Sequence, residues 1–213
     1  MNKKALLIGL YVFFVAGGVW NTLRVFEAAM AVMTPFVMVA VGVAAFLLTF
    51  ELNSKSIAAG ITVLLVTFVC EASGTNLGFP FGEYAYTHRL GPKLLDVPLV
   101  IPFAWLGVLV AAWISAGHFL KLKKAVVASI LVTVFDAVME FAADALDLWH
   151  WKGGLPTELN YISWFVISYG CLSLLKRFAR EKEPNPLVAH LLASQLVYFV
   201  LTVIGLRLVN PQA

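Results

Sequence analysis

Residues 30–50 read MAVMTPFVMVAVGVAAFLLTF, and no charged side chain interrupts these 21 residues. A helix needs about 20 apolar residues to cross the hydrocarbon core of a bilayer. Over the whole chain, 61% of the residues are hydrophobic and 13% are charged, about half the charged share of a water-soluble domain. Both observations predict a protein that is embedded in a membrane.

Further apolar stretches lie on both sides of this segment. They predict an all-α, polytopic integral membrane bundle with about seven transmembrane helices, forming a single membrane domain over residues 1–213. Lys3 and Lys4 precede the first stretch as in a signal peptide, but we expect this stretch to be retained as the first helix. The seven stretches are Ala5–Leu23, Met30–Phe50, Ser56–Ala72, Leu99–Phe119, Ala125–Leu146, Tyr161–Leu175 and Leu187–Leu208.

The basic residues are distributed unevenly between the two sides of the predicted bundle. Ten of the 15 lysines and arginines fall at the N-terminus or in the connections that share its side, and five fall on the opposite side. Because cytoplasmic loops carry an excess of basic residues, this bias predicts a cytoplasmic N-terminus and an external C-terminus in the cell membrane.

Two of the predicted connections are rich in glycine, proline and aromatic residues. They are Ser73–Pro98 and Asp147–Asn160, and the alternation of the helices predicts that both lie on the external side. Irregular backbone near a membrane is tolerated where protein covers it or where it lines a cavity. Trp149 and Trp151 therefore have two interpretations, as anchors at the membrane interface or as the wall of a cavity.

The fifth stretch carries a row of acidic residues, Asp136, Glu140, Asp144 and Asp147, whose spacing places them on one helix face. No basic residue lies among them, so some must be protonated, paired with another helix or bound to a cation. Hydrogen bonds from neighbouring helices could also satisfy them as a structural strip. Glu71, at the end of the third stretch, is either a solvated helix end or a catalytic group.

This set of residues suits acid-initiated chemistry on an apolar alkene. A carboxyl group in a site of low dielectric constant can stay protonated and act as a general acid, while a second carboxylate activates water. Aromatic rings can stabilise a carbocation through the attraction that also binds cations. The two glycine-rich connections supply such rings.

Two stretches resemble one known family. Glu71–Tyr86, continued by Leu90-Gly-Pro and Val97-Pro98, and the segment from Asp136 through Trp149–Trp151 to Asn160–Trp164 resemble the signature blocks of the carotenoid 1,2-hydratases. The resemblance implies a polytopic membrane enzyme that adds water across the terminal double bond of an acyclic carotenoid. It implies a tertiary alcohol as product and no redox cofactor.

With this chemistry in view, we expect Glu140 or Asp144 to be the proton donor and Asp136 to be its electrostatic partner. Glu71 and Glu83 are candidates for orienting or activating water. The candidates for holding this water or shaping the pocket of the end group are Asn76, Tyr84, Tyr86, Trp151, Asn160 and Trp164.

Two other functions fit the acidic row. It could chelate magnesium in an intramembrane prenyltransferase, or it could form the path of a proton or cation transporter. For the hydratase we expect no cofactor and no metal site. The expected partners are an acyclic carotenoid, water and membrane lipid, without nucleic acid, and the oligomeric state is left open.

Overall fold

The computed structural model describes residues 2–117 and 121–209. Within them the chain forms seven helices and four short strands, so the predicted all-α bundle is confirmed. The last residues of the predicted stretch Leu99–Phe119 lie outside the described residues. The helices are α1 (Lys3–Thr22), α2 (Glu27–Thr49), α3 (Ser54–Leu77), α4 (Ile101–Ser115), α5 (Lys121–Ala145), α6 (Glu158–Phe178) and α7 (Pro186–Val209).

Five of these helices, namely α1, α2, α3, α5 and α7, are long and apolar enough to cross a membrane. The apolar α4 has 15 residues, which is short for a span. The 21-residue α6 carries Glu158 in its first turn and Lys176 and Arg177 in its last turn. The bundle therefore has the character of a membrane protein, while seven full spans remain a prediction.

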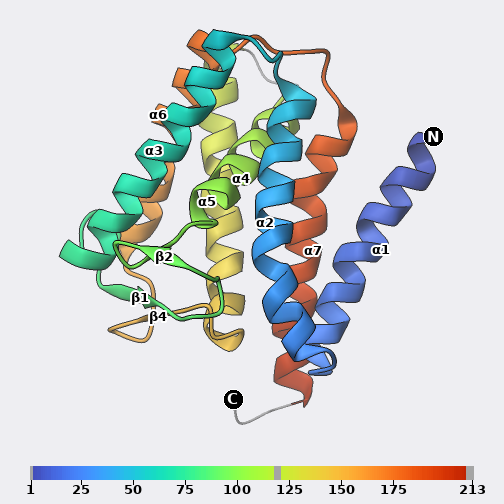
Figure 1. Cartoon of the computed structure of the whole chain (residues 1–213), viewed down its shortest axis with the longest axis vertical. Coiled ribbons are helices and arrows are strands. Elements are labelled where there is room, and N and C mark those ends of the chain that lie inside the picture. The colour runs from blue at the N-terminus through green and yellow to red at the C-terminus, as the bar shows by residue number, and fades with distance from the viewer. Residues whose placement is uncertain (1, 118–120, 210–213) are drawn as a thin grey trace.

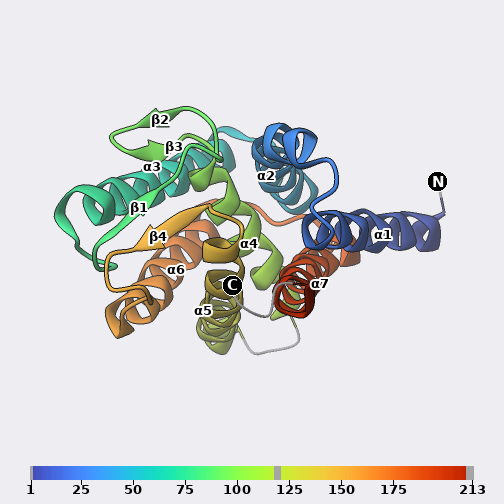
Figure 2. The same cartoon turned by 90° about the horizontal axis from the view of Figure 1, so that it is seen from below.

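Helix α4 occupies the centre of the bundle and contacts α2, α3, α5, α6 and α7 (Figures 1 and 2). Its backbone approaches α2 closely because glycines face each other there. A Cβ atom on Gly107 would lie 3.2 Å from Cα of Gly42, and one on Gly42 would collide with the carbonyl of Phe103. Small residues at such contacts let membrane helices pack by van der Waals attraction. Helix α1 lies at the edge of the bundle and packs mainly against α7.

The two glycine-rich connections meet at one end of the bundle. Strand β1 (Tyr84–Tyr86) in the first pairs antiparallel with β4 (Trp149–Trp151) in the second, so the prediction that both lie on the same side is confirmed (Figure 1). Strands β2 (Lys93–Leu94) and β3 (Val97–Pro98) form a small hairpin beside them. Arg89 also donates to Asp147 across 3.1 Å. This pairing covers the ends of α3 and α5, which carry acidic residues.

Candidate functional site

The β1–β4 ribbon presents four aromatic side chains on one face. Successive residues of a strand point to opposite faces, so Tyr84 and Tyr86 share a face, and so do their partners Trp151 and Trp149. The ring centroids of Tyr84 and Trp151 are 5.0 Å apart, and those of Tyr86 and Trp149 are 5.7 Å apart. Each of these rings places one polar hydrogen over the helices beneath the ribbon.

Glu71 of α3 is almost fully buried and accepts three hydrogen bonds. The hydroxyls of Tyr84 and Tyr86 both donate to Oε2, across 2.5 and 2.7 Å, and the indole N–H of Trp105 donates to Oε1 across 2.7 Å. Burial, and then the neighbouring charge of Glu71, raises the pKa of both phenols above their ordinary value. Both phenols therefore keep their protons and act as donors to this carboxylate.

Glu140 of α5 accepts from the other strand of the ribbon. The indole N–H groups of Trp149 and Trp151 both donate to Oε2, across 3.0 and 2.7 Å. Within residues 2–117 and 121–209 the other oxygen, Oε1, has no hydrogen-bond partner, and Glu140 lines a cavity. One oxygen of this carboxyl is thus held in place while the other is free to carry a proton.

Asp136 lies one helical turn before Glu140 and is fully buried. Its Oδ2 accepts from the Asn160 amide across 2.8 Å, while its Oδ1 is buried without a partner among the described residues. A buried oxygen that lacks a partner costs about 1–3 kcal/mol, more if it is charged. A bound water or a proton on Asp136 would remove this cost.

All three carboxyls are held by neutral donors. Among the described residues, no lysine, arginine or histidine forms an ion pair with Glu71, Asp136 or Glu140. Several buried acids without a cation cannot all be ionised in a low-dielectric site, so they share protons. Such a cluster can donate a proton at one carboxyl and hold negative charge at another.

A cavity of about 500 Å³ adjoins this cluster, and most of its wall is apolar. At the end near the carboxyls, Trp105 stacks on Trp164, with ring centroids 3.6 Å apart and ring planes 14° apart. The wall then continues over α2 and α7 to α1. The volume of the cavity falls within the roughly 300–1,000 Å³ that is usual for small-molecule sites. The cavity therefore suits an apolar ligand with one reactive end at the carboxyls.

The structure brings most of the predicted site residues together and leaves three outside. Glu71 and Glu140 line the cavity, as do Tyr84, Tyr86, Trp151, Asn160 and Trp164, while Asp136 is held through Asn160. Asp144 is exposed and bonded to His150, and Glu83 is exposed and paired with Lys152. Asn76 is exposed and donates to backbone carbonyls of Ala72 and Leu95.

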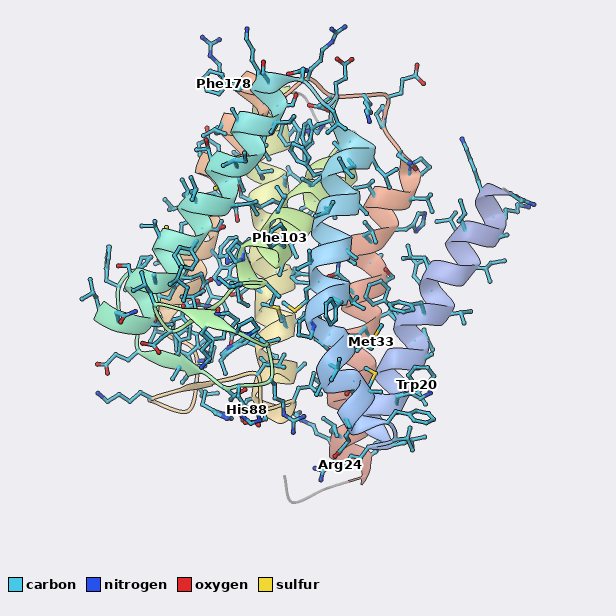
Figure 3. The ribbon with its side chains drawn as sticks, in the orientation of Figure 1. Trp20, Arg24, Met33, His88, Phe103 and Phe178 are labelled. Atoms are coloured by element: carbon cyan, nitrogen blue, oxygen red, sulfur yellow. The ribbon has the colours of Figure 1, made fainter. Side chains whose placement is uncertain are left out.

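Sequence reasoning missed the part of the wall that comes from the first two helices and the last. Phe13, Gly17 and Trp20 of α1 line the cavity together with Met30 and Met33 of α2. The side chains of Trp20 and Met33 are visible in Figure 3. The methionines of α2 are the one available signal, since methionine is frequent at adaptable apolar binding surfaces. Most such residues in a membrane helix face lipid, so the signal is weak.

Two comparisons with known proteins give a match. A family described as "Carotenoid biosynthesis protein" matches residues 22–212 of the chain. The chain is also similar to a bisanhydrobacterioruberin hydratase of Haloarcula japonica, with 29% identity over 117 residues. This alignment covers 50% of the chain and 40% of the relative, so the chain spans well under two thirds of that protein. No solved structure matches the chain.

Proposed function

The chain belongs to the family of carotenoid biosynthesis proteins, and on this premise we propose that it is a hydratase acting on an acyclic carotenoid. It adds water across the terminal 1,2 double bond of the end group and needs no redox cofactor. The observation that carries this proposal is the cluster of three buried carboxyls, held only by neutral donors, at one end of an apolar cavity. The hydratase named above supports the same reaction class.

In the first step, Glu140 transfers a proton from Oε1 to C2 of the alkene. The π electrons form the new C–H bond, and a tertiary cation is left at C1. The indole N–H groups of Trp149 and Trp151, which donate to Oε2 of Glu140, stabilise the carboxylate that results. The assignment follows from the free oxygen, because Glu71 already accepts a donor at each oxygen.

In the second step, water attacks the cation at C1 and the resulting oxonium ion returns one proton to Glu140. Alkene and water are thereby converted into a tertiary alcohol without net oxidation or reduction. Asp136 and Asn160 lie beside Glu140, and the free Oδ1 of Asp136 is suited to hold the attacking water. We assign the negative charge of the cluster to Glu71, because its two oxygens accept three donors. This charge and the stacked rings of Trp105 and Trp164 then stabilise the cation.

The pigments formed in cells provide the test. The chain is expressed in a bacterium that accumulates lycopene, and extracts are separated by liquid chromatography with mass detection. We expect a more polar pigment that is heavier by one or two waters. Glu140→Gln should lower its yield by a factor of about 10²–10⁴, the usual contribution of a general acid.

Asp144→Asn is the matched control, because it changes an exposed carboxyl one turn away on the same helix. It should leave the yield near that of the unmodified chain. If lycopene and shorter and longer acyclic carotenoids all remained unchanged, the hydratase proposal would be wrong. A product that required added magnesium would favour the prenyltransferase alternative.

We also propose that the chain lies in the cell membrane with its N-terminus in the cytoplasm. The bias of basic residues toward the N-terminal side supports this orientation. Cysteines introduced at Gly153, beside β4, and at Lys55, at the opposite end of the bundle, distinguish the two orientations. In intact cells an impermeant thiol reagent should label only Gly153→Cys, and labelling of only Lys55→Cys would reverse the orientation.

A further inference from the structure

The apolar cavity extends away from the carboxyls to the outer edge of the bundle. Four of its lining residues are also exposed on the outside of the molecule: Phe13 at 54%, Trp20 at 42%, Phe26 at 65% and Met33 at 53%. They belong to α1, to the start of α2 and to the connection between these helices. The cavity therefore opens at the seam between α1 and α2.

This seam is loosely packed. Helix α1 makes most of its contacts with α7 and few with α2, and it lies at the edge of the bundle when viewed along the helices (Figure 2). Gly17 lines the cavity at this opening, and the nearest atoms to a Cβ atom there would be in the ring of Tyr198, at 3.5 Å, and at the end of Met30, at 3.9 Å. Both helices are long and apolar enough to cross a membrane, so in a bilayer this opening would face the hydrocarbon.

A second cleft lies on the other side of the site and has a different character. It is lined by polar groups, including Glu83, Lys152 and Thr157, and it shares Trp151 with the apolar cavity. A long polyene dissolved in the bilayer would have to leave the hydrocarbon to enter through this cleft, which is unfavourable. The seam lets it stay in an apolar environment.

We propose that the substrate enters sideways from the lipid through the α1–α2 seam, with one end of its polyene at the carboxyls and the rest passing out beside Gly17 and Met33. This proposal rests on the proposed function for the identity of the ligand, an apolar carotenoid. It adds a route and a second set of binding residues. The carboxyl site then binds one end of the carotenoid at a time.

Three glycine variants test the route. Gly17→Leu narrows the seam. Gly9→Leu adds the same side chain to α1 two turns earlier, where nothing lies within 4 Å of the new Cβ. Gly153→Leu adds it to the polar cleft, where the space is also open. The chains are purified in mild detergent from lycopene-accumulating cells, and the polyene bound per protein is measured by its visible absorbance.

We expect Gly17→Leu to retain about tenfold less pigment, while Gly9→Leu and Gly153→Leu retain as much as the unmodified chain. Met33→Trp narrows the seam from the exposed side of α2 and should also lower the amount of pigment retained. This second variant keeps the test valid if Gly17→Leu does not fold. Three results would each overturn the lateral route. They are full retention of pigment by both seam variants, a loss of pigment in Gly153→Leu alone, and an unmodified chain that binds no pigment. Pigment that is retained but never hydrated would overturn the hydratase alone, because binding is measured separately from product mass.

Discussion

The two tyrosines that share one oxygen of Glu71 allow a quantitative test of how the site is held. Both hydroxyls donate to Oε2, while Trp105 occupies Oε1. A hydrogen bond to a charged group contributes about 1.5–3 kcal/mol. Removing one hydroxyl leaves Oε2 with one donor, so Tyr84→Phe or Tyr86→Phe should each lower the free energy of unfolding by about 1–2 kcal/mol.

Removing both hydroxyls leaves Oε2 buried without a donor. A buried charge that loses its partner costs about 3–5 kcal/mol. The double variant should therefore lose more than the sum of the two single variants, by about 0.5–3 kcal/mol as is usual for groups with a common partner. This excess is the signature of a single shared acceptor oxygen.

The free energy of unfolding is measured by adding a denaturing detergent to the protein in mild-detergent micelles and following helical circular dichroism. Tyr169→Phe is the control, because this tyrosine is 45% exposed and its hydroxyl has no hydrogen-bond partner among the described residues. Strictly additive losses would refute the shared acceptor. A double variant as stable as the unmodified chain would refute the inference that Glu71 is ionised.

Two further predictions concern the surface and the packing of the bundle. The ring N–H groups of His150 donate to Asp144 and Asp147, and these hydrogen bonds, the one to Asp144 first, raise the pKa of His150 above its ordinary value. The charged His150 therefore stabilises the folded state below about pH 6.5, and this contribution is lost as the pH rises through the raised pKa. His150→Ala should thus lower the melting temperature more at pH 6 than at pH 9, and an equal change at both pH values would contradict this. The loss in free energy of unfolding should be less than about 1 kcal/mol, because the His150 side chain is 52% exposed. Gly42→Ala should destabilise the protein by about 1–3 kcal/mol, because its Cβ collides with a carbonyl of α4. Gly170→Ala, whose Cβ meets nothing within 4 Å, should leave the melting temperature equal or higher, and equal losses in both variants would exclude the collision as the cause.

The positions of the helices could be predicted from the sequence because they depend on local properties. Apolar runs of the length of a bilayer identify the helices wherever they pack, and the number of spans between two connections decides whether these lie on the same side. The side shared by the two glycine-rich connections was therefore predictable, although their pairing as β1 and β4 was not. Strand pairing between segments more than 60 residues apart depends on how the intervening helices pack.

The sequence by itself determined that this is a helical membrane protein and that its acids gather on α5 and at the end of α3. Only the tertiary structure decided which of those acids lie at the cavity. Glu140 and Asp144 lie one turn apart, and the row of acids does not distinguish them. Glu140 is covered by the indoles of β4, whereas Asp144 remains exposed beside His150. The sequence does not show the opening at α1 and α2 either. Apolar residues that face lipid and those that line a cavity are of the same residue types, and only the packing of the helices distinguishes them.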